Sequence, residues 1–176
     1  MAIVTTDQQK TTLTETEDIV AFLAPHGVVF EHWPIPETIA KTITKTSLSD
    51  GEKSAILDGF RGKLDELART QGYVEADIVA LEPTTPGLEE ALAKFDKEHF
   101  HTDDEVRYII DGRGIFGFVT DQGHRFEIEV QRGEYIVIPK NAWHWFTLCE
   151  DRRIKAIRIF KDKSGWVPHY RNGSAA

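Results

Sequence analysis

The sequence predicts one mostly β domain, a jelly-roll barrel or a β-sandwich, with several peripheral helices in its N-terminal half. From residue 98 onward, short apolar runs alternate with glycine-containing turns, at an interval that is typical of antiparallel all-β units. In the run 125–130, apolar side chains alternate with charged ones, which indicates a strand with one buried and one solvated face. A chain of 176 residues, 40% of them hydrophobic, has the usual size of one domain. We place a helical and mixed part at about 12–97 and the β-barrel core at about 98–162.

Helical spacing dominates the first half of the chain. Thr14 with Glu17, and Ser49 with Glu52, have the spacing of capping boxes, and each pair precedes apolar residues at helical intervals. The run 73–81 is richer in β-branched residues and predicts a strand. The helices expected in this half begin near Thr14, Ser49, Gly62 and Thr85.

Strands and tight turns follow one another in the second half. The expected strands cover residues 107–110, 115–120, 125–130, 134–139 and 153–160. We expect turns at 111–114, 121–123, 131–133 and 140–143, the first three of which contain glycine. The first dozen residues are polar, and the tail 172–176 is expected to be frayed. Strands at this interval favour a closed barrel, because closure hides the strand edges.

Composition excludes several classes of partner and of site. The formal net charge of −8 and the pI near 5.4 argue against a nucleic-acid partner, which requires a basic surface. No stretch approaches the roughly 18 apolar residues that span a bilayer, and the first residues lack a secretory signal, so we expect a cytoplasmic protein without membrane association. Cys149 is the only cysteine, which excludes an internal disulfide and leaves nitrogen and oxygen as metal ligands. The acidic composition and the lack of an apolar stripe favour a monomer.

Two histidines and a glutamate lie close together where the β-rich half begins. His99, His101, Glu105 and Arg107 are all odd-numbered, so they share one face if this segment is extended. His144 must come from a distant strand, near Pro139, and it is flanked by bulky aromatic residues that would limit the access of water: Trp143, Trp145 and Phe146. The other histidines lack comparable spacing, and we expect them to be structural or exposed: His26, His32, His124 and His169.

These residues resemble the two metal-binding motifs of the cupin superfamily, a family of jelly-roll β-barrels. The first motif is His-x-His-x3-Glu-x6-Gly over 99–112, and the second is Gly-x5-Pro-x4-His over 133–144. The chain departs from the usual framing residues at Ala93, Asn141 and Leu148, although Asn141 can still adopt a left-handed conformation. Three neutral imidazoles and one carboxylate suit iron, nickel, cobalt, manganese or zinc, and they leave two positions of an octahedral ion free for a bidentate substrate.

A narrower resemblance covers nearly the whole chain. The helical N-terminal half, the segments 98–116 and 133–146, and a late Gly-Trp-Val-Pro-His-Tyr over 165–170 are similar to the acireductone dioxygenase family. The resemblance makes His99, His101, Glu105 and His144 the ligands of one Fe²⁺ or Ni²⁺ ion. It makes Arg107 the catalytic cation that contacts the substrate.

The resemblance also implies a reaction. Its substrate is an acireductone, 1,2-dihydroxy-3-keto-5-methylthiopentene, which is cleaved with O2 in methionine salvage. An iron form would produce formate and 4-methylthio-2-oxobutanoate, and a nickel form would produce formate, CO and 3-(methylthio)propanoate. The expected partners are therefore the small substrate and O2.

Four side chains beyond the ligands have both a functional and a structural interpretation. Phe95, Phe146 and Trp166 occupy positions where this family has aromatic residues around the substrate, but buried aromatics are also ordinary in a β core. Arg107 would be costly to bury without an anionic partner, which favours an anionic ligand. The alternative partner is a carboxylate of the chain, for instance Asp103 or Asp104 of a solvated turn.

Two other functions use the same residues. One is a different metal-dependent cupin, either another diol-cleaving dioxygenase or an isomerase. The other is a non-catalytic cupin that binds a small molecule through a metal. The intact ligand set with Arg107 favours an enzyme, and the substrate distinguishes the enzymes from one another.

Overall fold

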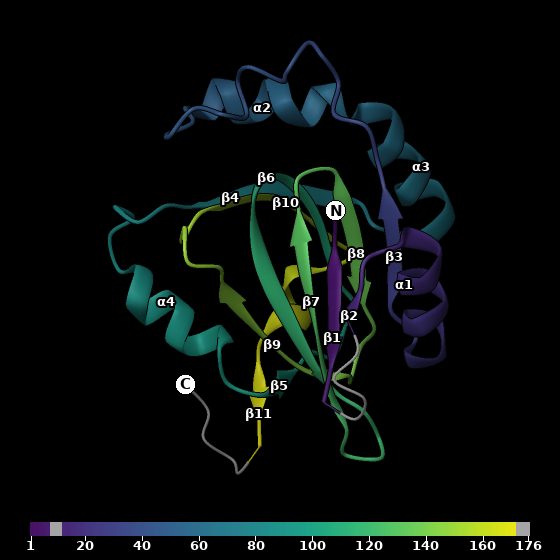
Figure 1. Cartoon of the computed structure of the whole chain (residues 1–176). Helices are drawn as coiled ribbons and strands as arrows, with labels where there is room; N and C mark the ends of the chain where they lie inside the picture. Colours follow the sequence, from purple (N-terminus) through teal and green to yellow (C-terminus); the bar gives the residue numbers. More distant parts are fainter. Residues whose placement is uncertain (8–11, 172–176) are drawn as a thin grey trace.

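The computed structural model describes residues 1–7 and 12–171, and it shows antiparallel strands in two sheets with helices on the outside (Figure 1). The strands are β1 (Ile3–Thr6), β2 (Thr12–Leu13), β3 (Val29–His32), β4 (Glu75–Leu81), β5 (His99–Phe100), β6 (Glu105–Val119), β7 (Arg125–Gln131), β8 (Glu134–Ile138), β9 (Trp143–Leu148), β10 (Ile154–Phe160) and β11 (His169–Tyr170). The helices are α1 (Thr16–Leu23), α2 (Asp50–Gly59), α3 (Arg61–Gln71) and α4 (Leu88–Phe95), with short 3-10 turns η1 (Ala24–His26) and η2 (Lys163–Trp166). This confirms the mostly β fold with peripheral helices.

Strand β6 joins the two sheets. Its first part pairs with β8 and β10, next to β3 and β4, and its second part pairs with β7 and β9. The turn predicted at 111–114 is therefore wrong, because the strand continues through these residues. Gly112 has a left-handed φ of 71°, and the pairing of β6 with β10 shifts register between Lys155 and Ala156. Gly112 thus lies at a β-bulge that bends one continuous strand, whereas the sequence pattern predicted a turn between two strands.

The remaining strands of the second half match the predicted pattern more closely. The hairpin between β6 and β7 turns at 121–123 as expected, and Phe126, Ile128 and Val130 of β7 are buried while their charged neighbours face outward. The turn at 131–133 does not close a hairpin, because β8 pairs with β3 and β6 rather than with β7. The chain therefore crosses from one sheet to the other after β7.

The first half contributes strands as well as helices. Ser49 and Glu52 form the predicted capping box at the start of α2. The capping box predicted at Thr14 is wrong: Leu13 still pairs with β1, and α1 begins at Thr16 without a side-chain cap. Helix α4 begins at Leu88, after a turn that contains Thr85.

Strands β1 and β3 were not predicted, because both are short and the first lies in a polar stretch. Strand β1 extends the sheet beyond β7, and β3 pairs with β8 at the edge of the other sheet. Residues 3–6 of the polar start are thus part of a sheet, and the tail 172–176, expected to be frayed, lies outside the described residues.

Two hydrophobic cores stabilise this arrangement. One fills the space between the sheets and includes Phe116, Ile128 and Ile136. The other lies between the helices and the outer face of the sheet that contains β3, β4, β8 and β10. It includes Ile56 of α2 and Tyr108 of β6. Figure 1 shows α2 across β4, β6 and β10 and α3 beside β3, while α4 lies on another side, near β5. Within residues 1–7 and 12–171, none of the helices has the length and apolar character needed to cross a bilayer.

Candidate metal centre and adjoining pocket

Four side chains from three strands and one connecting segment converge inside the barrel. His99 of β5 lies directly opposite His144 of β9, His101 follows β5, and Glu105 begins β6. One ligand atom from each residue lies within 4.8 Å of the others, and all four residues are buried. The structure therefore brings together the complete set of predicted donor residues.

The convergence does not come from a single strand. The segment 101–104 interrupts the extended conformation, and β5 and β6 belong to different sheets around this point. The prediction of one continuous strand face over 99–107 is therefore wrong. The two sheets close over the same space, so the side chains still meet.

Backbone carbonyls orient the three imidazoles. The Nδ1 atoms of His99, His101 and His144 lie 2.7, 3.3 and 2.9 Å from the carbonyl oxygens of Lys97, Val167 and Ala142. Because a carbonyl only accepts, each Nδ1 carries the proton and donates it, which leaves the Nε2 lone pair free. Imidazoles that ligate metals are commonly held this way, by a hydrogen bond to the other ring nitrogen.

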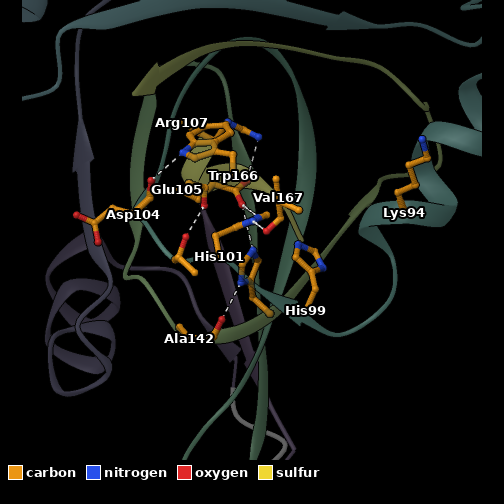
Figure 2. Close-up of polar contacts among 12 residues, drawn as sticks. Lys94, His99, His101, Asp104, Glu105, Arg107, Ala142, Trp166 and Val167 are labelled. Carbon is orange, nitrogen blue, oxygen red and sulfur yellow. Dashed lines mark hydrogen bonds and ion pairs between the residues drawn. The ribbon is translucent and has the colours of Figure 1, made fainter. Parts of the chain in front are cut away.

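The geometry around Glu105 fits a bound cation (Figure 2). Its Oε2 atom lies 3.0 Å from Nε2 of His101 and 3.0 Å from Nε2 of His144. With the protons on Nδ1, two lone pairs would point at a carboxylate oxygen, an arrangement that a shared positive ion stabilises. The donor set of three nitrogens and one oxygen suits a divalent transition metal, so the residues present fit the predicted ion.

Burial and charge set the protonation of the site. Burial, together with the nearby His144, lowers the pKa of His99 to about 4, so this imidazole is neutral at pH 7. Burial by itself raises the pKa of Glu105, but the charge of Arg107 holds it well below its usual value. The site therefore presents a neutral imidazole and a carboxylate, the forms that bind metals.

Arg107 lies beside the donors with one nitrogen free. Its Nη2 is 3.0 Å from Oε1 of Glu105, and its guanidinium lies 4.1 Å from the centre of the Trp166 ring (Figure 2). Its Nη1 is buried and has no hydrogen-bond partner among the described residues. Burial lowers the pKa of Arg107 to about 10, so it remains cationic at pH 7. An unpaired buried cationic donor of this kind marks a place for an anionic group.

The suggested structural partners of Arg107 have other roles. Asp104 accepts hydrogen bonds from the Tyr73 hydroxyl at 2.8 Å and from the Lys140 backbone at 3.0 Å. Its own carbonyl accepts from the indole nitrogen of Trp166 at 3.1 Å. Asp104 is thus more than a solvated turn residue, and the carboxylate that pairs with Arg107 is Glu105.

A mostly apolar pocket opens beside the donors. Two of the three predicted aromatic residues, Phe95 and Phe146, line this pocket together with His99, Glu105 and Arg107. The third, Trp166, lies over Arg107 and nearly parallel to the His101 ring. Sequence reasoning missed the remaining lining residues, which come from β4, β6 and β10: Val79, Leu81, Ile109, Phe116, Ile154, Ala156 and Arg158. Alternation along each strand could have suggested a shared face, but only strand pairing shows that these faces meet.

The apolar wall predicted around His144 is only partly correct. Phe146 lies on the same face of β9 as His144 and lines the pocket. Trp143 and Trp145 point to the opposite face, where their rings lie under the guanidinium groups of Arg171 and Arg125. Alternation along a strand requires this separation, because residues 143 and 145 differ from 144 by one.

The barrel with three histidines and one glutamate inside it defines a metal-binding cupin. The second motif also has the backbone it needs, since Asn141 adopts a left-handed φ of 66° where the superfamily often has glycine. A model of the ARD/ARD′ family matches residues 4–168, and the chain belongs to this family.

Individual relatives agree with this assignment. The chain is 47% identical over 163 residues to an acireductone dioxygenase of Leptospira biflexa, covering 93% of this chain and 92% of that protein. It is 41% identical to an acireductone dioxygenase of Exiguobacterium sibiricum, covering 97% and 95%. Among solved structures, the acireductone dioxygenase from Bacillus anthracis with a cadmium ion in its active centre superposes with a TM-score of 0.89 at 39% identity, covering 97% of this chain and 98% of that one.

Proposed function

We propose that this protein is a metal-dependent dioxygenase that cleaves 1,2-dihydroxy-3-keto-5-methylthiopentene, an acireductone, with O2. The observation that carries the proposal is the buried group of three imidazoles and one carboxylate next to the unpaired Nη1 of Arg107. The names of relatives that are 41–47% identical over most of the chain support the same activity.

We assign one Fe²⁺ or Ni²⁺ ion to His99, His101, Glu105 and His144. Both ions accept imidazole and carboxylate ligands, and the cadmium ion in the related Bacillus anthracis structure supports a metal at this place. When bound, such an ion acts as a Lewis acid that favours the deprotonated forms of the substrate oxygens.

Arg107 would bind the negative charge of the ionised substrate. An ene-diol beside a ketone becomes an anion when it loses a proton, and a fixed cation stabilises that charge without reorganising. Glu105 holds one guanidinium nitrogen and Trp166 covers the guanidinium face, so the orientation of the free Nη1 is set before the substrate arrives.

The apolar pocket would hold the methylthioethyl tail. Phe146 and Phe95 provide aromatic surface, and the aliphatic residues of β4 and β10 complete the wall. Apolar walls also exclude water from the substrate oxygens, which strengthens their interaction with Arg107.

The product set would depend on the metal. With iron we expect formate and 4-methylthio-2-oxobutanoate, and with nickel we expect formate, CO and 3-(methylthio)propanoate. The first keto acid is a precursor of methionine, so we place the iron reaction in methionine salvage. We propose that the enzyme acts in the cytoplasm, as a monomer, with the acireductone and O2 as its small-molecule partners.

The test begins with elemental analysis of the purified protein. An acireductone, for instance the desthio analogue, is then added in air to the iron-loaded and nickel-loaded forms, and oxygen uptake and CO are recorded. We expect rapid uptake by both forms and CO from the nickel form alone. Metal-loaded protein without oxygen uptake would contradict the proposal and leave a metal cupin of another function.

A further inference from the structure

Figure 1 shows α3 beside β3. Away from the metal centre, residues of α3, β3 and β8 line a second cleft. We call it the α3 cleft. Its volume is about 330 Å³. One wall is formed by α3, through residues that include Lys63 and Glu66, and the other by β3 and β8, through residues that include Glu31 and Tyr135. The proposed dioxygenase function leaves this cleft without a role.

Aromatic side chains form the floor of the α3 cleft. Trp33 and Tyr135 stack with ring centres 4.1 Å apart, and Tyr73 lies further along the same cleft. These rings are nearly buried, with 3–6% of each residue exposed, so the protein holds them in place. All three residues line the cleft, and the faces of aromatic rings carry a partial negative charge, which attracts cations.

The charges around the floor are mainly negative. Glu31, Glu66 and Asp104 line the cleft, and Lys63 is the only cationic side chain among the described residues that line it. Tyr135, with 3% of the residue exposed, lines the cleft beside these carboxylates. The cleft therefore combines aromatic rings with carboxylates.

The chain itself places an alkylammonium group in this cleft. The Nζ atom of Lys63 lies 5.1 Å from the centre of the Trp33 ring and 3.2 Å from Oε2 of Glu66. The Lys63 side chain is 44% exposed, so it can leave this position at little cost. Its ammonium group thus marks where a cation from solution would bind.

We propose that the α3 cleft is a binding site for an alkylammonium ion, which displaces the Lys63 ammonium group from the face of Trp33 and is held there by Glu66 and Glu31. Anions are disfavoured by the three carboxylates of the cleft. A neutral molecule of the same shape would gain the apolar contacts but neither the carboxylates nor the cation–π attraction.

The test uses choline as the probe and 3,3-dimethylbutan-1-ol as its uncharged analogue of the same shape. Equilibrium dialysis of radiolabelled choline is carried out with the metal-loaded protein at constant ionic strength. We expect saturable binding at one site, with the uncharged alcohol competing at least about tenfold less well.

Substitutions of exposed residues on α3 test where choline binds and should leave the protein folded. Lys63→Ala should tighten choline binding about threefold to tenfold, because the internal competitor is removed, and Glu66→Gln should weaken it by a similar factor. Arg69→Ala and Asp65→Asn make the same charge changes on α3 outside the cleft, and they should leave binding within about twofold.

Three results would overturn the proposal. They are an absence of saturable binding, equal competition by the uncharged alcohol, and equal effects of Lys63→Ala and Arg69→Ala. Because the readout is choline binding, it is independent of whether the protein consumes an acireductone.

Discussion

The chemistry of the metal centre depends on how single side chains are held. Each of the three imidazoles is fixed through Nδ1 by a backbone carbonyl, so its Nε2 faces the cavity that Glu105 also enters. The carbonyls come from Lys97, Ala142 and Val167, and substitution of those side chains would leave them in place. The ligand side chains are therefore the direct points at which to test the site.

Replacing a ligand should remove metal. In His101→Ala one nitrogen donor is lost, and Glu105 loses one of its two imidazole neighbours. We expect metal content, measured by elemental analysis after dialysis, to fall together with oxygen uptake, because the affinity of such a site depends on its full set of donors. His124→Ala, a histidine outside the group, serves as the control and should retain its metal. Full metal content in His101→Ala would show that the ligand assignment is wrong.

Replacing Arg107 should lower the rate of turnover but leave the metal bound. Arg107→Ala removes the free cationic donor while leaving all four ligands, so we expect metal to remain and kcat/KM for the acireductone to fall about 100-fold or more. Arg107→Lys keeps the charge but not the two-sided contact with Glu105 and Trp166, and it should recover part of the loss. Normal kinetics in Arg107→Ala would mean that the arginine is structural.

Cys149 should react slowly in the folded protein. It is 8% exposed, and burial raises the pKa of its thiol to about 11, so about one molecule in a thousand carries the thiolate at pH 8. We expect native protein to incorporate iodoacetamide at least about 100-fold more slowly than protein unfolded in urea at the same pH. Since Cys149 is the only cysteine, mass spectrometry of the intact chain reports on it alone. Comparable rates in the two states would contradict its burial.

Among the secondary-structure elements, β6 has the greatest influence on the architecture. It carries Glu105 and Arg107 at its start, passes through the bulge at Gly112 and continues into the other sheet. Charged groups surround this bulge: the fully buried Lys155 of β10 contacts Glu82 at 2.9 Å and Asp111 at 3.2 Å. Paired in this way, the ammonium group avoids the large cost of an isolated buried charge.

The bulge leads to a stability prediction. A Cβ at position 112 would lie 2.2 Å from the carbonyl oxygen of Arg153, and the residue would have to keep a φ of 71°. We expect Gly112→Ala to lower the free energy of unfolding by about 3 kcal/mol or more, measured by urea denaturation.

A helical glycine provides the matched control. Gly62 lies within α3, and a Cβ there would meet no atom within 4 Å. Gly62→Ala should raise the free energy of unfolding by about 0.5–1 kcal/mol, because alanine restricts the unfolded chain and favours helix. Equal stability of the two variants would exclude strain at Gly112.

Over the whole molecule, the metal centre connects parts of the chain that are distant in sequence. Its ligands come from β5 and β9 of one sheet and from the start of β6 in the other, and Val167 in the late segment orients His101. A bound ion would therefore hold both sheets together, and its free energy of binding would add to that of folding.

Removal of the metal should accordingly lower thermal stability. We expect chelation followed by dialysis to reduce Tm by about 5–10 °C relative to metal-loaded protein, and added metal to restore it. The variant His101→Ala should show a much smaller response to added metal in the same scan. A Tm that does not change with metal would contradict the role of the ion in joining the two sheets.

Much of the site could be predicted from the sequence, because its signals are local. The types and spacing of His99, His101, Glu105 and His144 indicate a nitrogen and oxygen metal site whatever the path of the chain between them. Alternation in β7 and the capping box at Ser49 are likewise properties of neighbouring residues, and the structure confirms both.

Other features depend on which strands meet. The same glycine signal accompanies a reversal at Gly123 and a bulge at Gly112, and the pairing of β10 with β6 decides between them. Pairing likewise brings β4 and β10 into the wall of the pocket, and it directs Arg107 to Glu105 rather than to Asp104.

The sequence by itself thus determined the mostly β class, the donor set and the cationic residue beside it. Only the tertiary structure decided that β6 runs through both sheets, that one nitrogen of Arg107 has no partner in the described part of the chain, and that an acidic aromatic cleft forms beside α3. The physical reason is that periodicity and capping act over a few neighbouring residues, whereas strand register and burial arise from contacts between residues far apart in the chain.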